Sequence, residues 1–324
     1  MYSTLTFFLS NIYGKRGIMM LHFIVNPNAR SGQGLLIWNK IETELKKRKV
    51  EYKTYFTLYQ RHATSIVKEL TVDPEPKTLV ALGGDGTINE VINGIVHPEH
   101  ITLGYIPIGS GNDFARGMHL PFEISKALDR IINPKIFTQI DFGIVKYKQK
   151  ERRFVVSSGM GYDAAICHAL CISKAKTFFN KLKLGKIAYV FLAFRQLYLC
   201  EPQTFTIKMD DKEEMKFEKA LFVTAMNLPY EGGGCMFCPK AKQDDGLLDM
   251  IVVNDISKWK VFLVLPTVFS GNHTHFKGIN LYRFKKATIK STGSMPLHCE
   301  GEPIVPQKEI EFSLAPQKIR FIVG

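Results

Sequence analysis

The chain has 324 residues, of which 45% are hydrophobic and 23% charged, which excludes a disordered or fibrous protein and suggests about two globular domains. The formal net charge of +13 favours anionic partners, such as nucleotides or an acidic membrane surface. The six cysteines follow no regular framework and predict reduced thiols in a cytoplasmic protein. No run reaches the roughly 18 apolar residues of a membrane-spanning helix.

Residues 1–18 are expected to lie outside the fold. They lack a basic segment before their apolar part and a small-residue cleavage site, so they do not predict a signal peptide. The pair Met19-Met20, directly before the first strand, indicates a translation start placed too early. We expect residues 1–18 to be disordered or peripheral.

Strands and helices alternate from residue 19 to residue 135. Apolar runs predict buried strands at 21–25, 52–57, 78–82 and 101–106. Ser31 can cap a first helix, whose apolar face would carry Leu36, Ile37, Ile41 and Leu45. Further helices are predicted from residue 61 and after Thr87. This order predicts an α/β domain with a parallel sheet and right-handed crossovers.

Loops of small and polar residues follow three of these strands, at 26–32, 83–87 and 109–113. The carboxyl ends of parallel strands share one edge, so we expect the loops to converge on one crevice. Glycines let backbone N–H groups approach an anion, and a helix N-terminus favours negative charge. A carboxylate in such a cradle would repel phosphate unless a cation lies between them. Asp85 therefore predicts bound Mg²⁺, and Asp113 is placed to share it.

After residue 135 the pattern changes. Short apolar or alternating runs predict a mainly β second domain over 136–315, with strands at 144–147, 153–157, 205–208, 219–227, 248–253 and 286–290. A helical insertion at 164–199 interrupts it. Its second half mixes lysines with aromatic and aliphatic residues, so it either packs on the sheet or brings a basic end to anionic lipid.

Two motifs carry a resemblance to a known family. GGDGTINEVING at 83–94 and IGSGNDFAR at 108–116 resemble the catalytic domain of the diacylglycerol kinase superfamily, which includes bacterial lipid kinases and sphingosine kinases. NPNARSG at 26–32 fits the family's first phosphate loop, and the resemblance runs over residues 20–324. NAD kinases and 6-phosphofructokinases share the GGDGT-type turn but are not expected to carry GSGNDFAR. The resemblance implies ATP- and Mg²⁺-dependent phosphorylation of a lipid hydroxyl, with residues 316–324 returning to the first domain.

The residues expected to hold ATP come from the loops and from the resemblance together. They are Asn26, Pro27, Asn28, Ser31, Gly32, Thr57, Gly83, Gly84, Asp85, Gly86, Thr87, Asn89, Glu90, Ser110 and Asn112. Neither G-x-x-x-x-G-K-[ST] nor G-x-G-x-x-G is present, which excludes a P-loop and a dinucleotide fingerprint.

The resemblance also implies roles in the second domain. The family usually has Asp-Gly-Glu where this chain has Glu300-Gly301-Glu302, so Glu302 is the expected general base and the role of Glu300 is in doubt. A structural Mg²⁺ is implied at the Asp245 carboxylate and the backbone carbonyls of Lys242 and Leu247. Asp141 and Asp163, which are expected near turns at the domain edge, are further candidates for the site or for a structural role. The pair Cys235 and Cys238 has C-x-x-C spacing, but no second ligand pair is in register for zinc.

Two other interpretations stay open. One is a kinase of a soluble acceptor such as NAD; the other is a non-catalytic basic module for nucleic acid or membrane. The intact acidic motifs and the lack of an RNA-type aromatic motif argue against the module, so no nucleic acid is expected. Among lipids, diacylglycerol leads by family frequency, while phosphatidylglycerol, a sphingoid base or another lipid alcohol is open. We expect a cytoplasmic protein that contacts an anionic membrane peripherally, and a homodimer is left open.

Overall fold

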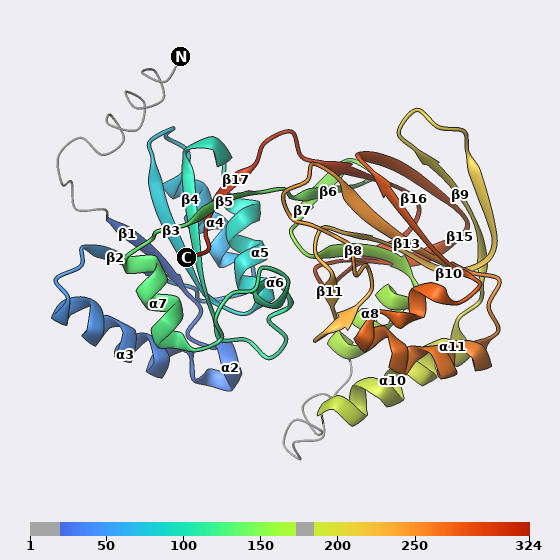
Figure 1. The fold of residues 1–324 in the computed structure, drawn as a ribbon, viewed down its shortest axis with the longest axis horizontal. Coiled ribbons are helices and arrows are strands. Elements are labelled where there is room, and N and C mark those ends of the chain that lie inside the picture. The colour runs from blue at the N-terminus through green and yellow to red at the C-terminus, as the bar shows by residue number, and fades with distance from the viewer. Residues whose placement is uncertain (1–19, 173–184) are drawn as a thin grey trace.

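The computed structural model describes residues 20–172 and 185–324. The expectation for residues 1–18, and the basic residues at 181–184 expected at a membrane, lie outside these ranges. Two domains lie side by side, an α/β domain and a mainly β domain (Figure 1). The predicted fold class is therefore confirmed.

The first sheet has six strands in the order β2-β1-β3-β4-β17-β5. The strands β1 (Leu21–Val25), β2 (Tyr52–Phe56), β3 (Lys77–Gly83) and β4 (Ile101–Pro107) are parallel, and β17 (Ile319–Ile322) continues this pattern beside β4. The last strand therefore returns to the first domain. The strand β5 (Phe137–Ile140) pairs antiparallel with β17, although the sequence placed it in the second domain. Its four residues pair with Ile319–Ile322, near the end of the chain, and local patterns do not reveal so distant a partner.

Helices cover both faces of this sheet. One face packs against α4 (His62–Leu70), α5 (Asp85–Gly94) and α6 (Asp113–Gly117), and the other against α3 (Gly34–Lys47) and α7 (Ile124–Ile132). A short α2 (Ala29–Gly32) and a 3-10 turn η1 (Pro98–His100) complete the domain.

The first helix differs from its prediction. Ser31 has a left-handed φ of 58° and caps nothing, and α3 begins at Gly34. The apolar face of α3 buries Trp38 together with Ile37, while Leu36 is 64% exposed. At 100° per residue, Leu36 lies about 140° around the helix from Ile41, which turns it away from the sheet.

The second sheet has nine strands. Eight follow the order β14-β13-β10-β8-β15-β16-β6-β7, and β9 pairs with both β10 and β15. Their bounds are β6 (Gly143–Tyr147), β7 (Lys150–Phe154), β8 (Ser157–Gly161), β9 (Gln203–Met209), β10 (Met215–Met226), β13 (Leu248–Asn254), β14 (Ile279–Phe284), β15 (Lys286–Cys299) and β16 (Glu302–Leu314). The predicted strand at 153–157 is wrong, because the chain leaves β7 at Val155 and enters β8 at Ser157.

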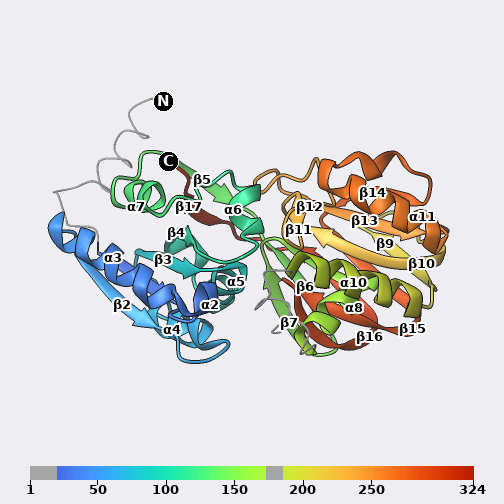
Figure 2. The ribbon, with the colours of Figure 1, turned by 90° about the horizontal axis from the view of Figure 1, so that it is seen from below.

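A layer of helices covers one face of the second sheet (Figure 2). It contains α8 (Tyr162–Ile172), α10 (Gly185–Leu199) and α11 (Lys258–Val264), followed by 3-10 turns η2 (Leu265–Ser270) and η3 (Asn272–His275). A small hairpin of β11 (Tyr230–Glu231) and β12 (Cys235–Met236) faces the first domain. Among the helices in the described ranges, none has the length and apolarity that a membrane crossing requires.

Candidate active site

Three loops meet at the carboxyl edge of the first sheet. A Cβ on Gly109 would come within 2.6 Å of Gly84 Cα, so the loops after β3 and β4 touch through their backbones. A Cβ on Gly34 would lie 2.2 Å from the carbonyl oxygen of Asn26, which brings the first loop against α3. Asn26 also donates its side-chain amide to Thr87 at 3.2 Å. The result is a surface of main chain at the N-terminus of α5, where an anion can approach N–H groups.

Asp85 and Asp113 both bring a carboxylate oxygen close to Gly111. A Cβ built on Gly111 would be 3.2 Å from Oδ2 of Asp85 and 3.7 Å from Oδ2 of Asp113. Asp85 accepts the N–H of Phe114 at 3.0 Å, and Asp113 accepts the N–H of Gly233 at 2.6 Å. Oδ1 of Asp113 is buried without a hydrogen-bond partner among the described residues. Burial raises the pKa of both acids, that of Asp113 to about 6, so the pair favours a bound cation.

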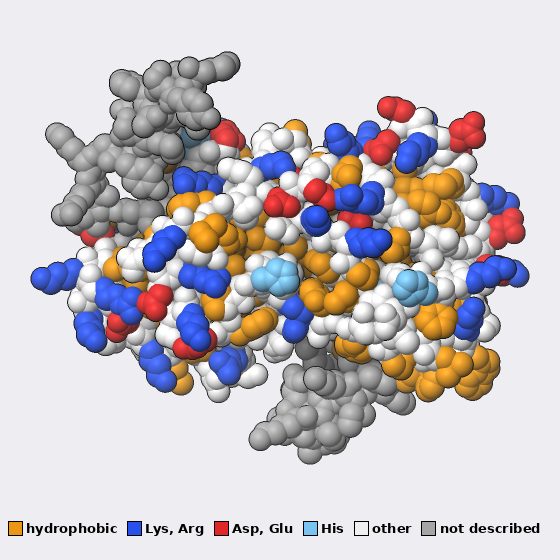
Figure 3. Space-filling model, viewed as in Figure 1, with side chains coloured by type: hydrophobic (Ala, Val, Ile, Leu, Met, Phe, Trp, Pro, Cys, Tyr) orange, Lys and Arg blue, Asp and Glu red, His pale blue; other side chains and the backbone are white. Residues whose placement is uncertain are grey.

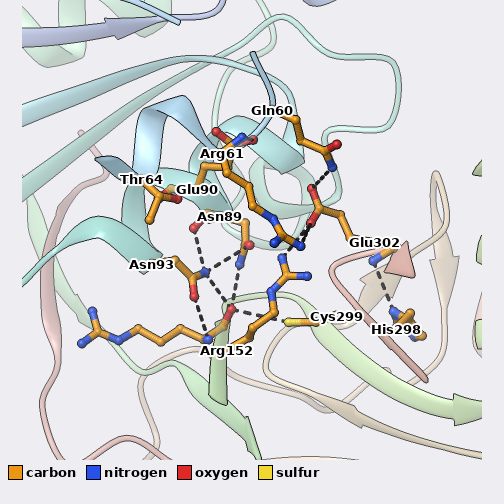
Figure 4. Close-up of polar contacts among 12 residues, drawn as sticks. Gln60, Arg61, Thr64, Asn89, Glu90, Asn93, Arg152, His298, Cys299 and Glu302 are labelled. Carbon is orange, nitrogen blue, oxygen red and sulfur yellow. Dashed lines mark hydrogen bonds and ion pairs between the residues drawn. The ribbon is translucent and has the colours of Figure 1, made fainter. Parts of the chain in front are cut away.

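Two residues expected at the nucleotide bind other parts of the protein instead (Figure 4). Glu90 accepts the backbone N–H groups of Arg61 and Ala63 at 2.9 and 3.3 Å, which satisfies the first turn of α4. Asn89 donates to the carbonyl oxygen of Arg153 in the second domain at 2.9 Å. Both side chains therefore have a structural role in this arrangement.

The remaining expected residues lie in the three loops or beside them, and their exposure differs. Asn112 accepts from the Gly109 N–H and donates to its carbonyl oxygen, both at 2.9 Å, and so closes its own loop. Ser31 and Ser110 are exposed, and Thr57 is buried at the end of β2. The other members of these loops are Pro27, Asn28, Gly32, Gly83 and Gly86.

Glu302 lies between the domains, where two arginines and a glutamine contact its carboxylate (Figure 4). Its carboxylate accepts from Arg152 Nη2 at 2.8 Å and from Gln60 Nε2 at 3.1 Å, with Arg61 Nη2 at 3.9 Å. Arg152 and Gln60 come from different domains, so Glu302 bridges the seam. Glu302 does not line the large cavity that reaches Asp85.

Glu300 lies two residues away in a different environment. Glu300 and Gly301 have φ of 56° and 72° and form the two-residue turn between β15 and β16, where Cys299 pairs with Glu302. Oε1 of Glu300 accepts the N–H groups of Val155 at 2.5 Å and Val156 at 2.7 Å. Burial raises the pKa of Glu300 to about 8 against the effect of these two hydrogen bonds.

A cavity of about 320 Å³ extends from these acids into the second domain. Near the domain seam its lining includes Asp85, Asp113, Glu231 and Glu300. Between the second sheet and its helices the lining becomes apolar, with Tyr162, Ile166, Phe222, Ile251, Val264 and Val268 among its residues. Such a site has a small charged end and a long apolar end.

Sequence reasoning missed a buried cluster beside this cavity. His298 Nε2 lies 3.1 Å from Asp163 and 3.3 Å from Glu231. Burial lowers the pKa of His298, but Glu231 and Asp163 outweigh this effect and raise it to about 9, so Nε2 carries a proton and donates it to these carboxylates. Cys167, Glu231 and His298 also come within 4.8 Å of one another, but a protonated Nε2 is unavailable to a metal. These residues come together only in the folded chain, so no local sequence pattern indicates the cluster.

The expected structural metal site has a different arrangement. The Asp245 carboxylate is paired with Arg283, whose Nε lies 3.8 Å from Asp249, and the backbone N–H of Leu247 donates to Asp245 at 3.1 Å. A metal at Asp245 would have to displace this guanidinium, so the residues do not fit one as they stand.

Two further predictions concern neighbouring residues. Asp141 is fully buried, accepts the Gly246 N–H at 2.8 Å and pairs with Lys318 at 3.0 Å, which is a structural role. Cys235 and Cys238 are buried free thiols, and within the described ranges they belong to no group with metal-ligand spacing.

Comparisons with known proteins agree with this geometry. Residues 20–145 match the family model "Diacylglycerol kinase catalytic domain", and residues 156–323 match "YegS C-terminal NAD kinase beta sandwich-like domain". A diacylglycerol kinase of Staphylococcus saprophyticus is 32% identical over 225 residues, covering 69% of this chain and 70% of the relative. YtlR of Bacillus subtilis, whose name places it among lipid kinases, is 28% identical over 286 residues, covering 86% and 92%.

Solved structures show the same fold. One titled as a diacylglycerol kinase from Bacillus anthracis has a TM-score of 0.67 at 20% identity and covers 95% of this chain and 97% of its own. An NAD kinase from Archaeoglobus fulgidus in complex with ATP has a TM-score of 0.50 at 10% identity, covering 94% and 93%.

Proposed function

Because the chain belongs to the diacylglycerol kinase family, we propose that it transfers the γ-phosphate of ATP to the hydroxyl group of diacylglycerol. The observation that carries this proposal is the cavity, which joins the acids of two phosphate-type loops to a long apolar space. A phosphoryl-transfer enzyme needs positioned groups and neutralised charge more than covalent chemistry. The acidic end supplies positioned groups, and the apolar end suits the chains of a lipid.

In this proposal the backbone of loops 26–34, 83–87 and 109–113 holds the nucleotide phosphates. Asp85 and Asp113 would hold Mg²⁺, and this assignment is supported by the buried Oδ1 of Asp113, which makes no hydrogen bond to the described residues and has Arg116 Nε at 3.7 Å. When bound, Mg²⁺ neutralises charge on the phosphate oxygens. The backbone N–H groups of Phe114 and Gly233 keep the two carboxylates turned toward Gly111.

We assign proton acceptance from the lipid hydroxyl to the 300–302 turn, and the geometry favours Glu300 over the expected Glu302. Glu300 lines the cavity, and two backbone N–H groups orient its carboxyl group. Glu302 instead binds Arg152 and Gln60 outside the cavity lining. These contacts to residues of both domains suit a positioning role for Glu302 at the domain seam.

The charge of the cavity discriminates between acceptors. Its described lining contains five acidic residues and no lysine or arginine, so it disfavours the phosphate of phosphatidylglycerol. Diacylglycerol carries no charge and keeps a free hydroxyl. A soluble acceptor such as NAD would leave the apolar lining unused and would bring its own phosphates to the acids.

The test is a kinase assay with radiolabelled ATP and a panel of diacylglycerol, phosphatidylglycerol, a sphingoid base and NAD. We expect phosphatidic acid as the main labelled product. Glu300→Gln should slow turnover by about a hundredfold or more, as loss of a general base does, with a smaller effect of Glu302→Gln. The opposite ranking would return the base role to Glu302, and labelled NADP without labelled lipid would refute the lipid acceptor.

A further inference from the structure

A short helical segment at the cavity has two apolar faces. The inner face of α11 and η2 contributes Val261, Val264, Leu265 and Val268 to the cavity lining. The outer face is open: Trp259 is 82% exposed and Leu263 is 73% exposed. A segment of an isolated globular protein normally buries one apolar stripe and keeps the other side polar.

The outer face continues onto the end of α10. The rings of Phe194 and Phe262 lie 4.3 Å apart, and Lys258 Nζ donates to the carbonyl oxygen of Tyr198 at 2.6 Å. We name the apolar patch by its exposed members, which are Tyr198, Leu199, Trp259, Phe262, Leu263 and Phe269. Figure 3 shows hydrophobic side chains gathered at the lower right, where Figure 1 places α11.

Lysines outnumber acids in the segments that carry the apolar patch, where the acid Glu201 follows the end at Leu199. Between Asp255 and Glu300 the sequence contains no acidic residue, whereas Lys258, Lys260 and Lys277 flank the patch in the chain. Large apolar side chains bordered by lysines, with Trp and Tyr among them, are typical of segments that lie in a membrane interface. A contiguous patch of this kind on a folded domain marks an interaction site.

We propose that the apolar patch docks on an anionic phospholipid bilayer, with α11 lying between the lipid and the cavity. Trp259 and Leu263 enter the interface, the lysines meet lipid phosphates, and the acceptor passes beside α11 into the space lined by Val264 and Val268. Docking itself does not depend on the reaction. The passage of the acceptor rests on the proposed lipid kinase function.

Tryptophan fluorescence can test docking in the unmodified protein. The chain has two tryptophans: Trp38 is 2% exposed in the core, so a change on adding vesicles reports Trp259. We expect a blue shift and co-sedimentation with vesicles of phosphatidylcholine and phosphatidylglycerol in equal parts, and weaker binding to phosphatidylcholine alone. Leu263→Ser should weaken partitioning about tenfold, because it removes one buried leucine from the interface. Leu36→Ser, at a 64% exposed position on α3, is the matched control and should change nothing.

Other outcomes would overturn the proposal. No fluorescence change with either vesicle, or equal losses in Leu263→Ser and Leu36→Ser, would do so. Unaltered vesicle binding together with conversion of a dimer to a monomer in Leu263→Ser would assign the patch to a second copy of the chain. In the kinase assay, Leu263→Ser should lose more activity on diacylglycerol in vesicles than on a short-chain acceptor in solution, and equal losses would refute lipid entry at α11. Vesicle binding without phosphorylation of any lipid would refute the proposed function and leave docking supported.

Discussion

The backbone N–H of Gly233 in the second domain donates to Oδ2 of Asp113 in the first domain at 2.6 Å. This hydrogen bond crosses the seam between the domains at the acids of the site. Gly233 has a φ of 84°, and a Cβ there would meet nothing within 4 Å, so backbone conformation rather than space favours glycine. The position of Asp113 therefore depends on the relative placement of both domains.

Asp85 should be indispensable for turnover but not for folding. Asp85→Asn keeps the oxygen that accepts the Phe114 N–H and removes the negative charge beside Gly111. We expect kcat/KM for ATP-dependent lipid phosphorylation to fall by about a hundredfold or more, since charge stabilisation is the main catalytic resource in phosphoryl transfer. Thermal melting should show a shift of only a few degrees. Asp73→Asn, at an exposed acid before β3, is the control, and an Asp85→Asn enzyme with most of its turnover would contradict the metal assignment.

Arg153 should stabilise the contact between the domains at the C-terminal end of α5. Its Nη1 donates to the carbonyl oxygens of Ile92 at 3.0 Å and Ile95 at 2.6 Å, and its backbone N–H donates to Asn93 Oδ1 at 2.9 Å. Arg153→Ala leaves these carbonyls without a charged donor, and we expect unfolding to become easier by about 3 kcal/mol in urea titrations. Because α5 starts at Asp85, the KM for ATP should rise as well.

The control for Arg153 is Lys150→Ala on the exposed start of the same strand. Arg153→Lys retains the charge but not the forked donor, and it should recover only part of the stability. Equal urea midpoints for Arg153→Ala and Lys150→Ala would refute the stabilising role of Arg153.

The sequence predicted the parallel strands well, because buried runs such as 78–82 and 101–106 are continuous and end at glycine or proline. It missed β16, whose two prolines argue locally against a strand, although its partners β15 and β6 hold it in the sheet. Contacts between residues that are distant in the sequence also decided the roles of side chains at the candidate active site. Asn89 and Glu90 stand in a nucleotide-type motif, but their hydrogen-bond partners come from Arg153 and Arg61, which are distant in sequence.

The segment 255–299 illustrates the same point for the cavity. The lack of acids after Asp255 can be read directly, but α11 has only seven residues and no clear amphipathic period, because both of its faces are apolar. The cluster of Asp163, Glu231 and His298 joins three separate elements and has no local signature.

Asp245 should be stabilised by Arg283 rather than by a metal. In the absence of nucleotide, we expect a chelator to shift the melting temperature of the wild type and of Asp245→Asn equally, since any cation at Asp85 is common to both. Arg283→Gln frees the Asp245 carboxylate, costs at most about 1 kcal/mol because the pair is partly exposed, and should make melting more responsive to Mg²⁺. A chelator shift in the wild type that disappears in Asp245→Asn would establish the structural metal instead.

Glu300 should make the folded protein less stable as pH rises. Its folded pKa is raised to about 8 from an ordinary value of 4.5, so its stabilising contribution is fully present below about pH 4.5 and is lost as pH rises through 8. Within this window the loss approaches about 1.4 kcal/mol per pH unit for one proton. Glu300→Gln keeps an oxygen for the Val155 and Val156 N–H groups but cannot ionise.

We therefore expect urea midpoints measured between pH 5 and pH 8 to fall less steeply in Glu300→Gln than in the wild type, with chelator present to exclude cations. A residual slope should persist, since burial also raises the pKa of Asp113. Glu213→Gln, at an exposed acid in the β9–β10 hairpin, should retain the wild-type slope. Parallel lines for the wild type and Glu300→Gln would contradict the raised pKa and would mean that Glu300 is already ionised in the folded protein at neutral pH, the form in which a carboxylate accepts the proton of the lipid hydroxyl.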